Sequence, residues 1–171
     1  QPAPLLLSML AGVRTDGLAT LFPGAPIIRV MPNTPARIGR GVSTLFAHGA
    51  SAADKAAASW LMEQAGSAIW LAREEAFDAV TAVSGSGPAY VFLLAEALQA
   101  AGEAEGLPAD AARALTVQTL LGAARMLDAD DTPASELRRR VTSPNGTTQA
   151  AIESFERNGF RDIVARAVHA A

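Results

Sequence analysis

The sequence predicts a mainly helical protein that opens with a short α/β segment. Three observations predict this class. Residues 1–73 alternate short β-like runs with short helical ones, residues 74–171 show almost uninterrupted helical periodicity, and half of the 171 residues are apolar, which is enough to form a core. The alternation indicates that residues 1–73 are the tail of a doubly wound α/β unit. The helical periodicity indicates that residues 74–171 form an all-helical unit.

The α/β segment contains short apolar runs typical of strands and is punctuated by proline. Candidate strands are Leu5–Leu10, Pro26–Met31, Val42–His48 and Ala68–Leu71. The prolines of Pro32–Pro35 end the second of these strands, because proline has no N–H to donate to a sheet.

Two helices are expected between these strands. Thr15 or Asp16 is expected to cap the first, which stops at Phe22-Pro23. Ser51 and Asp54 have capping-box spacing for a second helix over 52–65, which Gly66 would close.

The remaining residues show the start and stop signals of consecutive helices. The expected helices are 74–83, 88–105, 108–128, 133–141, 147–158 and 160–170. Pro88, Pro108 and Pro133 fit first helical positions, and Gly106 and Gly159 fit C-terminal stops. Because small residues, mostly alanine, let helix axes approach closely, we expect these helices to pack against several neighbours and to form a subunit interface.

Composition excludes several classes of function. The net charge is −3 and the Lys and Arg residues are scattered apart from Arg138-Arg139-Arg140, so no nucleic-acid footprint is expected. We read the arginine run as a solvated helix end. No apolar run was found to reach the ~18 residues of a membrane span. The absence of cysteine excludes disulfides and thiol catalysis and is compatible with a cytoplasmic protein, and no clustered metal ligands are found.

Two glycine pairs are incomplete nucleotide motifs. Gly39-Arg40-Gly41 and Gly85-Ser86-Gly87 each begin a G-x-G, but the sixth position is Thr44 in one and Tyr90 in the other. Neither matches the dinucleotide fingerprint.

The stretch from Ser84 to Pro88 has two further interpretations. It is similar to a nucleophile elbow, but Ser84 stands where the first glycine belongs, and neither His48 nor His169 is an obvious base. Gly-x-Gly-Pro also suits a chain that breaks one helix and starts another. Structural and functional roles remain open here.

The segment Thr142–Thr148 gathers polar side chains in front of a helix. These are Ser143, Asn145, Thr147 and Thr148, around Gly146. One cap suffices for a helix, and Ser143 is expected to supply it, so the others suggest a ligand. Because the first turn of a helix has unpaired N–H groups and partial positive charge, we expect a small anion, most naturally a carboxylate.

Four segments together resemble pyrroline-5-carboxylate reductase. They are Arg29–Pro35, Asp78–Tyr90, Gln118–Leu127 and Val141–Thr148, in the same order as in that family. The resemblance covers nearly the whole chain. It implies that 1–73 is a remnant of a Rossmann-like domain that holds NADPH or NADH, and that 74–171 is an interlocking helical domain for dimerisation and substrate binding. It further implies a homodimer and, in many members, a decamer of five dimers.

The resemblance also implies a reaction and a site. Such oxidoreductases reduce 1-pyrroline-5-carboxylate to L-proline, the last step of proline biosynthesis. Residues matching Ser143, Asn145, Gly146, Thr147 and Thr148 bind the substrate, Thr148 hydrogen-bonds the ring nitrogen as the catalytic residue, and Asn33 lies beside the cofactor. The family loop usually reads Ser-Pro-Gly-Gly-Thr-Thr. Asn145 replaces its first glycine, and because asparagine tolerates positive φ, the turn is expected to survive.

The start of the chain leads to an expectation about its extent. Gln1-Pro2-Ala3-Pro4 runs directly into the apolar Leu5–Leu10, as if a domain had been cut, and the glycine-rich turn is not found. We therefore expect a piece of a reductase that binds no dinucleotide and is inactive alone. The alternatives are a catalytically inactive helical dimerisation module and a reductase paralogue that acts on another cyclic imine.

Overall fold

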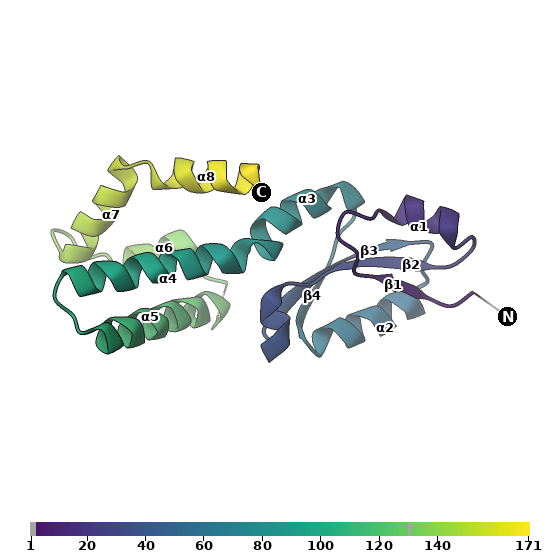
Figure 1. Ribbon diagram of the computed structural model, residues 1–171, viewed down its shortest axis with the longest axis horizontal. Coiled ribbons are helices and arrows are strands. Elements are labelled where there is room, and N and C mark those ends of the chain that lie inside the picture. Colours follow the sequence, from purple (N-terminus) through teal and green to yellow (C-terminus); the bar gives the residue numbers. More distant parts are fainter. Residues whose placement is uncertain (1–2, 130) are drawn as a thin grey trace. The chain divides into compact units, whose positions relative to one another are not determined.

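The computed structural model describes residues 3–129 and 131–171 (Figure 1). Gln1 and Pro2, where the predicted truncation begins, lie outside the described residues. The chain divides into two compact units, one reaching to Pro88 and including Ala170 and Ala171, the other Ala89–His169. This division follows spatial proximity, whereas the predicted one, between residues 73 and 74, follows the change from strands to helices.

The first unit contains a four-stranded sheet in the order β1-β2-β3-β4. The strands are β1 (Leu6–Ser8), β2 (Ile27–Met31), β3 (Gly41–His48) and β4 (Gly66–Trp70). The β1–β2 and β3–β4 pairs are parallel, and β2–β3 is antiparallel. Helices α1 (Thr15–Leu21) and α2 (Ala52–Glu63) connect the parallel neighbours and cover opposite faces (Figure 1). The predicted α/β tail is confirmed, with one reversal of strand direction.

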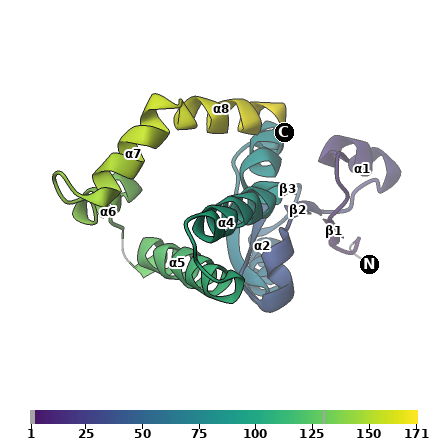
Figure 2. The same cartoon turned by 60° about the vertical axis from the view of Figure 1, so that its left-hand side comes forward.

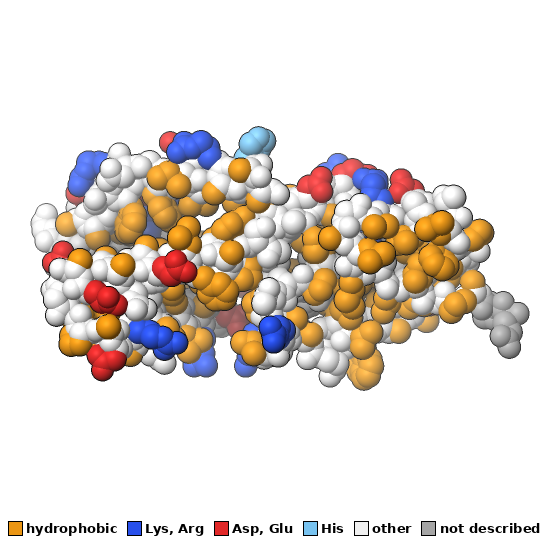
Figure 3. Space-filling view, viewed as in Figure 1, with side chains coloured by type: hydrophobic (Ala, Val, Ile, Leu, Met, Phe, Trp, Pro, Cys, Tyr) orange, Lys and Arg blue, Asp and Glu red, His pale blue; other side chains and the backbone are white. Residues whose placement is uncertain are grey.

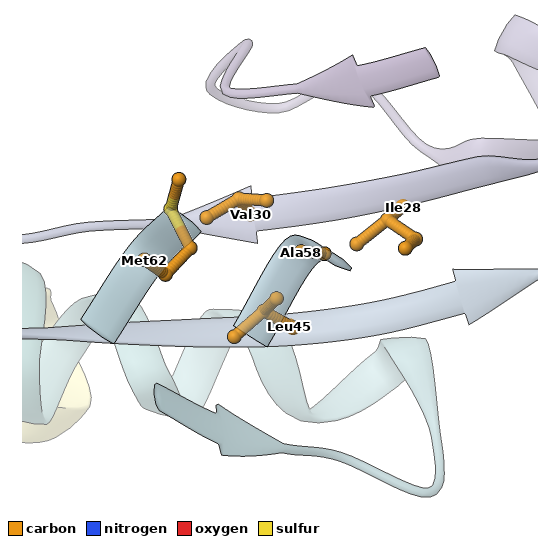
Figure 4. Close-up of a cluster of buried hydrophobic side chains, with 5 residues drawn as sticks. All are labelled: Ile28, Val30, Leu45, Ala58 and Met62. Atoms are coloured by element: carbon orange, nitrogen blue, oxygen red, sulfur yellow. The ribbon is translucent and has the colours of Figure 1, made fainter. Parts of the chain in front are cut away.

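The core of this unit lies between the sheet and α2. Ile28 and Val30 of β2 and Leu45 of β3 face Ala58 and Met62 of α2 (Figure 4). Because side chains alternate along a strand, the residue between Ile28 and Val30 faces the opposite side of the sheet. That alternation places Arg29 under α1.

The capping of α2 follows the prediction at its start and departs from it at its end. The Ser51 hydroxyl accepts from the Asp54 N–H, and the Asp54 carboxylate accepts from the Ser51 N–H at 2.8 Å. The helix ends at Glu63 and is followed by Gln64 as its cap. Gly66 begins β4 in register with Gly41 instead of closing the helix, because the chain must turn into the sheet there.

The start of α1 differs from the prediction that Thr15 or Asp16 caps it. Arg14 is the N-cap and makes no side-chain cap bond. The Thr15 N–H and hydroxyl both donate to the Glu74 carboxylate, at 2.9 and 2.7 Å. A carboxylate from the distant turn η2 (Glu74–Ala76) thus binds the first turn of α1.

Glu74 also forms a buried ion pair. Its Oε1 accepts from Arg29 Nη1 at 2.9 Å, and both side chains are less than a tenth exposed. The Arg29 guanidinium lies 4.4 Å from the ring centre of the buried Phe77, a cation–π contact. Burial acts to raise the pKa of Glu74, but the bonds from Thr15 and Arg29 together hold this pKa below its ordinary value of 4.5. One carboxylate therefore ties α1, β2 and η2 together.

The chain then passes from η2 through a π-helical turn into a long helix. Helix α3 (Phe77–Val80) is followed by η3 (Thr81–Gly85) and α4 (Gly87–Ala104). The Ser86 N–H donates to the Thr81 carbonyl at 2.8 Å, the spacing of a π-turn. The expected break at Ser84–Pro88 is therefore a widened turn inside one helical run.

That helical run changes one expectation about membranes. Glu74–Ala104 contains an 18-residue window with mean hydropathy 1.2 and is, by length and composition, able to cross a membrane. The sequence prediction that no run is long enough was therefore wrong. One such helix is weak evidence for a membrane, because the interface helices of proteins in water share this composition.

The second unit consists of helices that bury little of their own surface. Besides α4 it contains α5 (Ala109–Ala129), α6 (Ala134–Arg140), α7 (Thr147–Arg157) and α8 (Phe160–Ala170). Helices α4 and α5 lie side by side (Figures 1 and 2). Among the described residues of 89–169, only Ala112 and Thr116 are buried. Large apolar side chains are exposed along every helix except α6: Val91, Phe92, Leu93, Leu94, Leu98, Leu115, Val117, Leu121, Met126, Leu127, Phe155, Phe160, Ile163 and Val164.

Candidate functional site

The predicted site residues lie in the loop between α6 and α7 and in the first turn of α7. The Thr142 hydroxyl donates to the Arg138 carbonyl at 2.6 Å and so extends the end of α6. The Gly146 N–H donates to the Ser143 carbonyl at 3.1 Å and closes a tight turn. Asn145 has φ 60°. It therefore adopts the left-handed conformation expected for a residue that replaces glycine.

The first turn of α7 has backbone amides without a partner in the helix. Gly146 is the N-cap and receives no side-chain cap bond, so the expectation that Ser143 caps this helix was wrong. Ser143 lies three residues before the cap, and its carbonyl rather than its hydroxyl is used. The Ala150 N–H donates to the Gly146 carbonyl at 3.2 Å, which leaves the amides of residues 147–149 without an acceptor inside the helix.

The polar side chains of this turn are exposed. Ser143, Asn145, Thr147 and Thr148 are all solvent-accessible, and Gly146 is half-buried. The structure thus brings the five predicted substrate residues into one turn at a helix N-terminus. Hydroxyls and free amides are neutral donors, and the helix end adds partial positive charge. This arrangement can bind a small carboxylate.

Sequence reasoning missed Gln149, which holds the loop from within the helix. Its Oε1 accepts from the Asn145 N–H at 2.8 Å, and its Nε2 donates to Glu153 at 2.7 Å. Gln149 follows Gly146 by three residues, the spacing at which a capping-box Gln reaches back to the chain before a helix. That spacing could have revealed it.

The arginines before the loop have carboxylate partners. Arg139 and Arg140 both donate to Glu136 of their own helix. The hydrogen bonds from Arg139 and from Arg140 lower the pKa of Glu136 to about 2. Arg139 is therefore engaged within α6.

Arg138, Arg139 and Arg140 form the predicted exposed end of α6, and Arg138 also has a partner on another helix. It contacts Glu156 of α7 at 3.3 Å, and Glu156 also binds Arg161 of α8 at 2.8 Å. This network joins three helices. Since these arginines already have acidic partners, attraction of an anion to the loop falls mainly to the α7 amides.

A second feature of the helical unit is an apolar groove of about 630 Å³. Its lining comes from α4, α6, α7 and α8. The polar members are Arg138, Glu156 and Arg161, and the apolar members are Leu94, Leu98, Ile152, Phe155, Phe160, Val164 and Ala165. Phe155 and Phe160 meet edge to face at 5.3 Å. Figure 3 shows hydrophobic side chains at the surface of the helical unit. The lining fits apolar side chains rather than a carboxylate.

Asn33 lies in the α/β unit and makes two hydrogen bonds there. Its Nδ2 donates to the Ser84 carbonyl at 3.3 Å, and its Oδ1 accepts from the Val42 N–H at 2.9 Å. The Ser84 carbonyl precedes Pro88 by four residues, and Pro88 has no N–H to donate to it. The Asn33 amide supplies the missing donor. Its predicted place beside a cofactor stays a prediction.

The glycines of Gly39-Arg40-Gly41 serve packing. Gly39 ends the 3₁₀ turn η1 (Thr34–Ile38) with φ 68°. At Gly41 a side chain would come within 2.6 Å of the Ala36 nitrogen. Neither glycine is arranged to cradle a phosphate. Among the described residues, no group of three His, Asp or Glu side chains is placed to hold a metal ion.

The sequence model for pyrroline-5-carboxylate reductase dimerisation matches residues 74–171. The chain belongs to the pyrroline-5-carboxylate reductase dimerisation family. The matched region begins at Glu74, the residue whose carboxylate joins the first turn of α1 to β2, and it includes the whole 142–148 turn.

Relatives of this family extend the match to the α/β unit. The chain is 50% identical over its full length to pyrroline-5-carboxylate reductase of Pseudomonas aeruginosa and 41% identical over 98% of its length to that of Synechocystis. It spans 63% of the length of each.

Solved structures agree with this fold. A pyrroline-5-carboxylate reductase from Coxiella burnetii superposes with a TM-score of 0.94 at 40% identity, over 97% of this chain and 62% of that one. Plasmodium falciparum pyrroline carboxylate reductase with NADP bound gives 0.88 at 33% identity, over 97% and 67%.

Proposed function

We propose that the natural protein containing this chain is an oxidoreductase that reduces 1-pyrroline-5-carboxylate to L-proline with NADPH or NADH. The observation that carries this proposal is the exposed turn at the start of α7, with free amides and paired threonines, in a chain of this family. The chain supplies the substrate loop and the dimer interface. We also propose a cytoplasmic location, with which the absence of cysteine is compatible.

In this proposal the α7 turn positions the substrate. The amides of residues 147–149 donate to the substrate carboxylate, with Ser143, Asn145 and Gly146 shaping the turn around it. The Thr148 hydroxyl contacts the ring nitrogen. Since a protonated imine is already electrophilic, the site needs orientation and charge complementarity more than a strong base.

The residues of this chain do not by themselves form a dinucleotide site. Gly39 and Gly41 are used in packing, and both polar ends of the Asn33 side chain contact the protein. When bound, a reduced nicotinamide supplies the hydride. We therefore expect the 171-residue chain alone to show no NADPH-dependent reduction. Ordinary turnover by this chain would contradict that expectation.

Replacing Thr148 with alanine tests the proposed role of its hydroxyl. In the natural full-length protein we expect kcat/KM for 1-pyrroline-5-carboxylate to fall about tenfold to a hundredfold, the cost of one lost hydrogen bond to a charged group. Assembly should be unchanged, because α7 receives no cap bond from Thr148. Steady-state kinetics and analytical ultracentrifugation make the measurement.

The matched control is Thr20→Ala, which removes an exposed hydroxyl that donates to the Asp16 carbonyl. If Thr148→Ala abolishes dimerisation but leaves kcat/KM per dimer intact, the residue is structural and its assignment fails. Rescue of a proline-requiring bacterium by the full gene separates this reductase from a paralogue acting on another cyclic imine. An inactive dimerisation module would fail both tests.

We also propose that a second copy covers the exposed apolar helices, giving a homodimer and possible assembly of five dimers. Phe92 and Leu93 of α4 are 62% and 66% exposed, and burying each such side chain contributes about 1.5 to 3 kcal/mol. Leu93→Glu is therefore expected to raise the dimer dissociation constant at least about tenfold. Sedimentation equilibrium measures this constant.

The control for Leu93→Glu is Glu96→Gln, a change at an exposed polar position of the same helix. It should leave the dissociation constant unchanged. A wild-type protein that sediments as a monomer at all concentrations would overturn the proposed dimer. Co-sedimentation with lipid vesicles would instead indicate that Glu74–Ala104 enters a membrane.

A further inference from the structure

Asn145 and Gly146 form an asparagine–glycine pair inside the proposed substrate turn. The Asn145 N–H is held by Gln149, but among the described residues the Asn145 side-chain amide has no hydrogen bond, and it is exposed. Glycine has no Cβ, so its nitrogen can approach the side chain before it more closely than that of any other residue. This pairing favours a reaction between the two residues.

We propose that Asn145 is a site of spontaneous deamidation and that the new carboxylate switches off the anion-binding turn. The Gly146 nitrogen loses its proton and attacks Asn145 Cγ. A bond from this nitrogen to Cγ forms, the bond from Cγ to Nδ2 breaks, and ammonia leaves with the proton. Water then opens the resulting succinimide ring at either carbonyl and gives aspartate or isoaspartate. No group is oxidised or reduced.

The chain carries its own internal comparison at Asn158-Gly159. Asn158 has the same following residue and is also exposed, but its Nδ2 donates to the Ser154 carbonyl at 2.8 Å. Both glycine amides donate to carbonyls three residues back, at 3.1 Å. The two pairs therefore differ in this side-chain bond and in backbone conformation, since Asn145 has φ 60° and Asn158 has φ −89°. Asn33, the third asparagine, precedes a threonine and is bound at both ends.

The effect on binding rests on the proposed function. A carboxylate at position 145 lies directly before the first turn of α7, where the helix dipole favours a negative charge. It would take the place of the substrate carboxylate and repel it. Isoaspartate would also add a backbone atom to the tight turn that the Ser143 carbonyl and Gly146 N–H close.

Peptide mass spectrometry of the natural full-length protein during incubation at mildly alkaline pH tests the site. A hydrogen bond contributes about 0.5 to 1.5 kcal/mol, so we expect Asn145 to be modified roughly two- to tenfold faster than Asn158. Asn145→Gln, whose longer side chain disfavours the five-membered ring, should remain unmodified at 145 and show an unchanged rate at 158. Equal rates, faster modification of Asn158 or an intact Asn145 would overturn the proposal.

Binding of L-proline, measured by calorimetry on the same samples, tests the switch. Affinity should fall in step with the fraction modified at 145, and the aged Asn145→Gln protein should keep its own starting affinity. Modified protein that still binds L-proline would overturn the switch. Fresh protein that neither binds proline nor reduces the imine would overturn the proposed function, while the mass measurement still decides the modification site.

Discussion

Replacing Glu74 with alanine is expected to lower the free energy of unfolding of the α/β unit by about 3 to 5 kcal/mol, because it leaves a buried arginine without its partner. Glu74 accepts three hydrogen bonds, two from Thr15 and one from Arg29. Without this carboxylate, the first turn of α1 loses its hydrogen-bond acceptor. The charge of Arg29 also stays buried without a partner, which destabilises the folded state. Urea unfolding followed by tryptophan fluorescence reports this unit, since Trp60 and Trp70 both lie in it.

The neighbouring Glu75 provides the control for this prediction. Its side chain is 65% exposed, and its ion pair within residues 3–129 and 131–171 is with the exposed Arg14, so Glu75→Ala should change the urea midpoint very little. Similar effects of the two substitutions would show that the buried network contributes nothing special.

The same carboxylate predicts a dependence on pH. Because its pKa is lower in the folded state than the ordinary value of 4.5, the stabilisation is complete above about pH 4.5 and is lost as the pH falls through the folded pKa. The difference in stability between wild type and Glu74→Gln should therefore shrink on acidification. A constant difference between pH 7 and pH 3 would contradict this.

Gly66→Ala is expected to destabilise the same unit by roughly 3 kcal/mol or more, through backbone strain added to a steric clash. Gly66 has φ 141°, and a Cβ at this position would overlap the Gly41 carbonyl of the neighbouring strand. Since Gly41 itself has no room beside Ala36, β3 cannot shift to make space. Thermal and urea unfolding measure the loss.

Two other glycines separate strain from overlap. Gly24 has φ 78° with open space around it, so Gly24→Ala should cost only about 1 to 2 kcal/mol. Gly17 lies in α1 with ordinary φ and open space, so Gly17→Ala should stabilise by up to about 1 kcal/mol. If Gly66→Ala costs no more than Gly24→Ala, the close approach of β3 and β4 is not rigid.

Local signals in the sequence predicted most elements, while long-range pairing was beyond them. The Ser51–Asp54 capping box and the positive φ of Asn145 depend on residues a few positions apart, and both are present. The helices after residue 87 begin and end within two residues of the predicted bounds, because proline and glycine mark their ends.

The misses have a common physical cause. Thr15 donates to Glu74, which is 59 residues away in the sequence, so no local sequence pattern could predict that contact. The antiparallel β2–β3 pair likewise depends on how the chain returns after η1. The Asn33 side chain donates to the Ser84 carbonyl, which Pro88 leaves without a donor. This contact could have been inferred only by relating the segment around Asn33 to the distant segment around Pro88.

The candidate turn was predicted as a group, and its internal hydrogen bonds were not. The five predicted residues between Ser143 and Thr148 do share one turn. The prediction that Ser143 caps α7 was wrong, and the hydrogen bond from the Asn145 N–H to Gln149 was not predicted. Several backbone amides lie within reach of each polar side chain, and the side-chain rotamer decides which one is bound. The sequence alone does not determine that rotamer.

The scarcity of buried residues in the helical unit has a consequence for folding. With only Ala112 and Thr116 buried among the described residues of 89–169, these helices gain little from packing within one chain. If a second copy covers them, as we propose, their folding and their association are a single bimolecular step. The stability of this half of the molecule then rises with protein concentration, and a dilute solution is itself a denaturing condition.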